Sequence, residues 1–139
     1  MHNKIIQRLE ARFSAYADLA DLLDDELLGL KIDVPKHKSL AEHLWCVIGG
    51  RESYARALTE GQWQGFACSM QSFNTTDFQS KLATSSHAVM ESLDGINDWT
   101  MEHDDLLAKL SEHEVMHEGQ IIRHMYALER ELPESWEWA

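Results

Sequence analysis

Apolar residues recur at steps of three and four along most of this chain, and this spacing constrains its fold more than any other feature. The first such stretch runs from about residue 3 to residue 30, with Leu9 and Phe13 among its apolar members. A repeat near 3.6 residues places these side chains on one face of an α-helix. The only prolines are Pro35 and Pro133, so little in the sequence breaks long helices.

The same periodicity predicts four long helices, at residues 3–30, 39–60, 76–94 and 104–131. The second and third begin with the patterns Ser39-x-x-Glu42 and Thr76-x-x-Gln79, each of which is typical of a capping box. No stretch alternates in the manner of a strand. The sequence therefore predicts an all-α protein of one domain, residues 1–139, built as a four-helix bundle.

The segment 61–75 between the second and third helices holds several apolar side chains, so it is expected to pack on the body of the protein. About 14 extended residues reach roughly 45 Å, whereas a helix of about 20 residues is only about 30 Å long. The segment can therefore cross the whole bundle. This length permits helices 2 and 3 to run parallel, which gives an up-down-down-up topology with a long crossover.

The balance of charge excludes several classes of partner. The chain has 24 acidic and 12 basic residues and a formal net charge of −12. Nucleic acid and anionic membranes both need a basic surface, so neither is an expected partner. No apolar run approaches the roughly 18 residues of a membrane span, and the first eight residues lack the apolar core of a signal peptide. The two cysteines, Cys46 and Cys68, form no disulfide framework, which favours a cytoplasmic location.

Histidines on the apolar faces of two helices are the strongest indication of function. His113 and His117 are four residues apart in the fourth predicted helix, on the same stripe as Leu110 and Ile121. Two imidazoles at this spacing can bind one metal ion. His43 lies on the apolar face of the second helix. The three are predicted to meet inside the bundle as a mononuclear site for a divalent metal.

Several residues near these histidines have more than one interpretation. His113-Glu114-x-x-His117 matches the zinc-protease pattern, in which Glu114 is a general base, but the chain offers no strand to align a peptide. No second Glu-x-x-His pattern supports a di-iron site. Cys46 is interpreted as a small buried residue, with a soft metal ligand or a redox-sensitive neighbour of the site as alternatives.

The remaining histidines are given ordinary roles. His124 is interpreted as a polar residue at the rim of the bundle, with a fourth ligand or a hydrogen-bond donor to a ligand as alternatives. The other four are expected to be solvated: His2, His37, His87 and His103. Trp136 and Trp138 are expected to cover a bundle end or to form a dimer contact.

Three passages resemble the DinB/YfiT-like family of metal-dependent bundles. The segment 39–44 followed by Glu52 resembles the family's first histidine segment, and residues 113–121 resemble its HxxxHxGQI signature. Residues 132–136 resemble the tail that follows its last helix. Glu118 departs from the pattern, because a basic residue often follows the second histidine of the pair. That departure argues against an anionic partner at this position.

This resemblance implies an up-down-down-up bundle, often dimeric, that binds a divalent ion through His43, His113 and His117. Zinc, nickel and iron all suit imidazole ligands. The family includes transferases and isomerases that use low-molecular-weight thiols. The hypothesis is therefore a metal-dependent thiol transferase or hydrolase that acts on a small molecule. A metal-binding or stress-associated homodimer without catalysis, and a bundle whose histidines only fill its core, are the alternatives.

Overall fold

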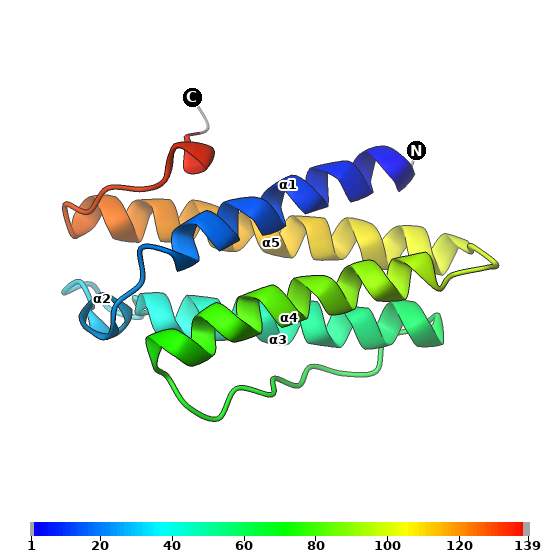
Figure 1. Ribbon diagram of the computed structural model, residues 1–139, viewed down its shortest axis with the longest axis horizontal. Helices are drawn as coiled ribbons and strands as arrows, with labels where there is room; N and C mark the ends of the chain where they lie inside the picture. Colours follow the sequence, from blue (N-terminus) through cyan, green and yellow to red (C-terminus); the bar gives the residue numbers. More distant parts are fainter. Residues whose placement is uncertain (1, 138–139) are drawn as a thin grey trace.

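The computed structural model describes residues 2–137, in which helices are the only regular secondary structure (Figure 1). The helices are α1 (His2–Ala20), α2 (Asp25–Gly29), α3 (Leu40–Glu60), α4 (Thr75–Asp94), α5 (Met101–Ala127) and the short 3-10 helix η1 (Glu134–Trp136). The all-α class and the four long helices are confirmed. Within these residues, no helix combines the length and hydropathy needed to cross a bilayer.

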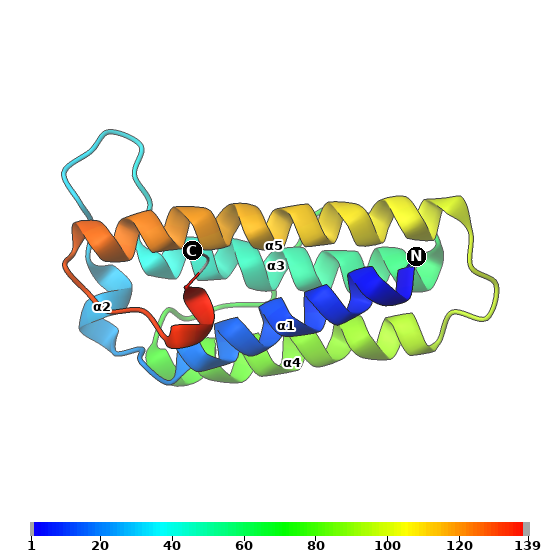
Figure 2. The same cartoon turned by 90° about the horizontal axis from the view of Figure 1, so that it is seen from above.

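The four long helices pack around two buried apolar clusters. α3 packs on α4 and α5, and α1 packs on the same two helices from the other side (Figure 2). One cluster contains Leu44 and Ile121, and the other contains Leu58 and Leu107. Arg51 and Glu114 lie between the two clusters along α3 and α5 and are both fully buried. A charged layer therefore divides the apolar core.

The prediction of one continuous helix over residues 3–30 is wrong. α1 ends at Ala20, and α2 begins at Asp25 after a turn. Asp24 Oδ1 accepts a hydrogen bond from the backbone N–H of Leu27 at 2.7 Å. This bond satisfies an orphan donor of a new helix, so the chain restarts there instead of continuing. Leu27 still reaches the core, with only 3% of its surface exposed.

The predicted start of the second helix is confirmed, whereas that of the third is wrong in detail. Ser39 caps α3 by accepting from the N–H of Glu42 at 3.2 Å. The Glu42 carboxylate does not complete the box but pairs with Lys31 at 2.8 Å. At α4 the cap is Asn74 and not Thr76. Gln79 donates instead to the carbonyl of Ala20 at 2.9 Å, which ties α4 to the end of α1.

The fourth predicted helix, at 104–131, is displaced toward the N-terminus, because α5 covers residues 101–127. Thr100 caps it, and the His103 ring accepts from the Thr100 N–H at 3.1 Å to close the box. His103 Nε2 lies 3.1 Å from the carbonyl oxygen of Leu58. His103 is buried, so the expectation that it is solvated is wrong.

The segment between α3 and α4 packs on the body, as predicted. The backbone N–H groups of Ala67 and Ser69 donate to the side chains of Ser53 and Glu52, each at 3.0 Å. Met70 in the same segment is 8% exposed. The segment runs back along the bundle from the end of α3 to the start of α4 (Figure 1).

The C-terminal part of the described chain closes over α1. Trp136 is 1% exposed, and its indole N–H donates to the carbonyl of Ala15 at 2.7 Å. Its ring meets Tyr16 edge-on, with 5.0 Å between centroids. Trp136 therefore covers the outer side of α1. Trp138, predicted for a similar role, lies outside the described residues.

Candidate metal centre

Two of the three predicted ligands come together inside the bundle. His43 stands in the first turn of α3, and His117 lies in the middle of α5. Their Nδ1 atoms are 3.2 Å apart, and each side chain is 3% exposed. Two imidazole nitrogens bound to one zinc ion, each at about 2.0–2.1 Å, are separated by roughly 3.3 Å in tetrahedral geometry. The observed separation is thus suitable for a shared metal ion.

His113 lies beside this pair. Its ring centroid is 4.6 Å from that of His117, one helical turn further along α5. The side chain is half-buried, and its Nδ1 is fully buried with no hydrogen-bond partner among the described residues. A buried imidazole nitrogen without a partner is costly, and a bound cation would remove that cost. The three residues therefore fit the donor set of a metal site.

Gly50 makes room for the His113 ring. A Cβ atom added at Gly50 would lie 2.5 Å from His113 Cε1 and 2.8 Å from His113 Nδ1. Both distances are shorter than any normal contact. A glycine in the middle of a helix costs about 0.5–1 kcal/mol relative to alanine. Because Gly50 has no side chain, α3 can approach the His113 imidazole closely.

The three imidazoles are near one another but do not yet surround a single point. Within residues 2–137, no group of three or more His, Cys, Asp or Glu side chains has its donor atoms gathered as a formed metal site would. His43 and His117 are at ligand spacing, whereas the Nδ1 of His113 points toward Gly50. His113, the third candidate ligand, lies beside the pair, but the three imidazoles are not gathered around one point.

Burial keeps these imidazoles neutral. It lowers the pKa of His43 to about 4, and the positive charge of Lys38 adds to the effect. Burial also lowers the pKa of His117 to about 3, with further contributions from His113 and His43. The pKa of His113 is lowered for the same reason. Neutral imidazole is the form that binds a metal ion, so protons do not compete for these nitrogens at neutral pH.

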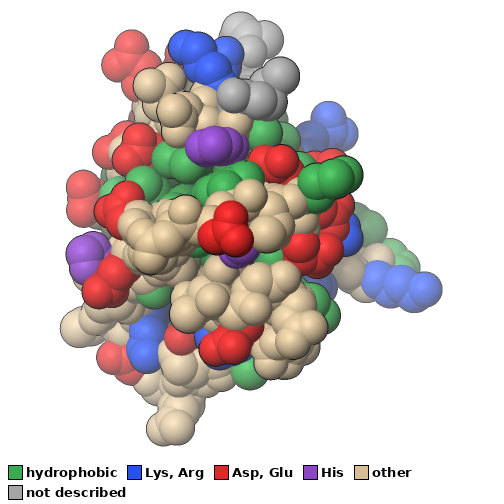
Figure 3. Space-filling view, turned by 90° about the vertical axis from the view of Figure 1, so that its right-hand side faces the viewer, with side chains coloured by type: hydrophobic (Ala, Val, Ile, Leu, Met, Phe, Trp, Pro, Cys, Tyr) green, Lys and Arg blue, Asp and Glu red, His purple; other side chains and the backbone are tan. Residues whose placement is uncertain are grey.

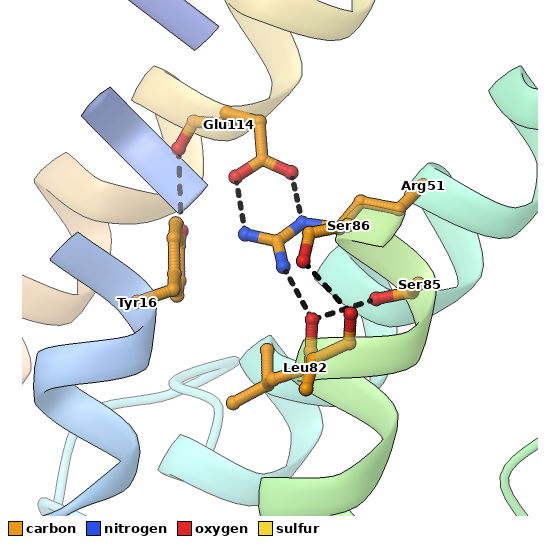
Figure 4. Close-up of polar contacts among 7 residues, drawn as sticks. Tyr16, Arg51, Leu82, Ser85, Ser86 and Glu114 are labelled. Carbon is orange, nitrogen blue, oxygen red and sulfur yellow. Dashed lines mark hydrogen bonds and ion pairs between the residues drawn. The ribbon is translucent and has the colours of Figure 1, made fainter. Parts of the chain in front are cut away.

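A buried ion pair lies directly behind the histidines. Arg51 Nε and Nη2 donate to the two carboxylate oxygens of Glu114 at 2.6 and 2.9 Å (Figure 4). Arg51 Nη1 donates to the carbonyl of Leu82 at 3.1 Å. The Tyr16 hydroxyl donates to the backbone carbonyl of Glu114 at 3.3 Å, and burial raises the Tyr16 pKa well above its usual value. These contacts fix α5 against α1, α3 and α4.

The zinc-protease interpretation of the His-Glu-x-x-His pattern is contradicted by this pair. In that interpretation the Glu114 carboxylate faces a metal-bound water. In the structure, both of its oxygens accept bonds from Arg51, and the residue is fully buried. Glu114 therefore positions the helix that carries His113 and His117.

Glu118 also points into the protein. One carboxylate oxygen pairs with Arg12 at 2.9 Å, and the other is buried without a partner among the described residues. Burial raises the Glu118 pKa to about 7, while Arg12 opposes the shift. Because Glu118 is fully buried, its charge does not face the side of α5 on which a ligand would bind.

A pocket of about 630 Å³ opens over the histidines, and we call it the histidine pocket. All three candidate ligands line it, together with residues of the 31–39 loop, the 61–74 segment and the outer side of α5. Cys46 lines it as well and is half-buried, with its Sγ 3.8 Å from Lys38 Nζ. The interpretation of Cys46 as a plain buried residue is therefore wrong.

Two further histidines extend the cluster, although for His124 this was only an alternative interpretation and for His37 it was not predicted. His124 is fully buried, and its Nδ1 lies 3.0 Å from Nε2 of His37 in the loop before α3. The ring of His124 is also 6.5 Å from that of His43, measured between centroids. The interpretations of His124 as a rim residue and of His37 as a solvated one are both wrong. The heptad spacing from His117 to His124 was the available signal.

A larger cavity of about 850 Å³ lies between α3, α4 and residues 95–98, at the other end of α3 from His43. The one histidine among its described lining residues is His103, which is already engaged with Thr100 and Leu58. The side chains that could bind a metal ion or take part in a reaction line the histidine pocket and not this larger cavity.

No protein-family model matches the chain, and no curated protein is detectably similar to it. These comparisons identify no family. The resemblance to the DinB/YfiT-like bundles stays a prediction from the sequence.

Proposed function

We propose that this protein binds one divalent metal ion through His43, His113 and His117 and acts on a small molecule held in the histidine pocket. The observation that carries the proposal is the 3.2 Å separation of the Nδ1 atoms of His43 and His117, which belong to different helices. The His113 imidazole, whose ring centroid lies 4.6 Å from that of His117, supplies the third donor. Zinc, nickel and iron suit such ligands.

The chemistry of the site follows from its donor set and its pocket. A divalent ion with three neutral ligands and open positions lowers the pKa of a bound water or thiol. The chain itself keeps the imidazoles neutral, excludes bulk water from His43 and His117, and provides a volume of the size that small-molecule sites have. We assign thiol transfer or hydrolysis to the site, with a low-molecular-weight thiol as the co-substrate of the transfer and water as that of the hydrolysis.

Family membership and assembly belong to the same proposal. We assign the chain to the DinB/YfiT-like bundles, with up-down-down-up topology and a homodimer as the assembly. The length of the 61–74 segment and its course along the bundle support that topology (Figure 1). A metal-binding dimer without catalysis is the alternative. The pocket over the imidazoles favours the enzyme, because metal storage needs no space for a second molecule.

Metal analysis of purified protein tests the site. We expect about one equivalent of zinc, nickel or iron per chain, and its loss in His43→Asn and His117→Asn variants. His87→Asn is the matched control, because His87 is exposed on α4, away from the pocket lining. Retention of the full equivalent by both ligand variants, or equal loss in the control, would show that the metal is bound by other residues.

Gly50→Ala provides an independent test of the third ligand. The new methyl group must displace the His113 ring, which is the far end of a flexible side chain, so the fold tolerates the change. Alanine also gains about 0.5–1 kcal/mol of helix stability over glycine. We expect metal affinity to fall about tenfold while stability is unchanged or higher. Competition with a chelator and a urea denaturation curve measure the two effects; unchanged affinity would exclude His113 as a ligand.

A further inference from the structure

The histidine pocket has a charge opposite to that of the protein as a whole. The chain carries 24 acidic residues among 139, so about two of the thirteen described lining residues would be acidic at the average composition. None of these thirteen is Asp or Glu, whereas Lys36, Lys38 and Arg123 all line the pocket. The other end of the bundle, with acidic side chains spread over its surface, shows the contrast (Figure 3).

These three cations have no ion-pair partner in the described part of the chain. Among residues 2–137, no carboxylate lies within ion-pair distance of Lys36, Lys38 or Arg123. The neighbouring Lys31 differs, because it pairs with Glu42 at 2.8 Å. Uncompensated cations at the mouth of a pocket attract an anion from solution.

Lys38 lies closest to the chemistry. Its ammonium group is 3.8 Å from Cys46 Sγ, and its charge acts on the imidazoles of both His43 and His117. Lys36 and His37 precede it in the 31–39 loop, and Arg123 faces the pocket from α5. Positive groups therefore stand on two sides of the space above the imidazoles.

We propose that the histidine pocket recognises a small anionic molecule, with its carboxylate or phosphate group held by Lys38, Lys36 and Arg123 and its other end directed at the imidazoles. The second half of this statement rests on the proposed function, whereas the first depends only on the charges of the pocket. Glu118, whose sequence position argued against an anionic partner, does not oppose it, because its carboxylate is buried against Arg12. The volume of about 630 Å³ suits a small molecule.

Alkylation of the cysteines in metal-free protein tests the charge of the pocket directly. Iodoacetate is anionic and iodoacetamide is neutral, and with either reagent the cysteine thiolate forms a carbon–sulfur bond as iodide leaves. The ratio of the two rates at one cysteine cancels its accessibility and its thiolate fraction, so it reports the local potential. Cys46 lines the pocket. Cys68 is equally half-buried but does not line the pocket, and it lies near the negative charge of Glu52.

We expect the iodoacetate to iodoacetamide ratio to be about tenfold higher at Cys46 than at Cys68, and to fall with added salt. Lys38→Met should lower the Cys46 ratio about threefold to tenfold and leave the Cys68 ratio unchanged. Lys31→Met is the matched control from the same loop, because the charge of Lys31 is already paired with Glu42. Equal ratios at the two cysteines, or no effect of Lys38→Met, would overturn the proposal.

Protection experiments identify the anion. Millimolar succinate or inorganic phosphate should slow the reaction of Cys46 with iodoacetamide in a saturable way, whereas the neutral succinamide should not. Stronger protection by succinate or by phosphate distinguishes a carboxylate from a phosphate group. Absence of protection by both would refute recognition of an anion. Because no metal is present, this result is independent of whether the proposed metal site exists.

Discussion

Replacing Arg51 with methionine is expected to lower the free energy of unfolding by about 3–5 kcal/mol. Arg51 is 0% exposed and makes a bidentate ion pair with the equally buried Glu114. Without the guanidinium group, the Glu114 carboxylate is left in an apolar interior with no opposing charge. That penalty exceeds the benefit of a methionine that packs well in the space.

The arginine also contributes packing that methionine replaces only in part. Its guanidinium carbon lies 4.5 Å from the centre of the Phe13 ring and 4.9 Å from that of Tyr16. A desolvated cation over an aromatic ring contributes about 2 kcal/mol. Through these contacts, and its bond to the carbonyl of Leu82, Arg51 joins all four long helices at one level of the bundle (Figure 4).

Urea denaturation of metal-free protein measures the effect. Arg8→Met is the control, since Arg8 is exposed on α1 and its loss should change stability by less than about 0.5 kcal/mol. The double variant Arg51→Met/Glu114→Leu should recover much of the loss, because both charges are then absent. A double variant no more stable than Arg51→Met, or an Arg51→Met variant equal to the control, would contradict this account.

This ion pair shows where prediction from the sequence ends. Arg51 and Glu114 lie on helices whose apolar stripes are clear in the sequence. A charged residue on such a helix is by default assigned to the solvated face of the helix. Only the packing of four helices shows that both side chains point inward at the same level. The split between α1 and α2 was not predicted, because Leu19, Leu23 and Leu27 keep a helical step of four residues across it.

The histidine cluster was predicted in part because its members follow helical periodicity. His43 and His117 lie on apolar stripes, and two amphipathic helices that bury those stripes must bring them inside. His37 is in a loop, where no periodicity exists, so its contact with His124 could not be predicted. The residues that line the pocket could not be predicted either, since they come from a loop before α3 and from the outer side of α5.

The second large expected effect is a loss of folding stability at acidic pH, which the protonation of Glu118 partly offsets. His43 and His117 have folded-state pKa values of about 4 and about 3, below the ordinary value of 6.5. As the pH falls below 6.5 the unfolded chain takes up protons that the folded protein does not, so stability decreases. Each imidazole contributes about 1.4 kcal/mol per pH unit over this window.

Glu118 acts in the opposite direction. Its folded-state pKa of about 7 is above the ordinary value of 4.5, so between these values the folded protein holds a proton that the unfolded chain has released. Stability therefore increases as the pH falls from 7 toward 4.5. A Glu118→Gln variant removes this contribution, while its amide oxygen can still accept the hydrogen bond from Arg12.

We therefore expect metal-free Glu118→Gln to lose about 4 kcal/mol of stability between pH 7 and pH 5 from His43 and His117 alone, and the parent protein to lose about half as much or less. The lowered pKa values of His113 and His124 add to the loss in both proteins. Urea denaturation across this range, in the presence of a chelator, provides the comparison. Parallel curves would show that the Glu118 pKa is not raised, and a flat curve for Glu118→Gln would show that the imidazoles are hydrated in the folded protein.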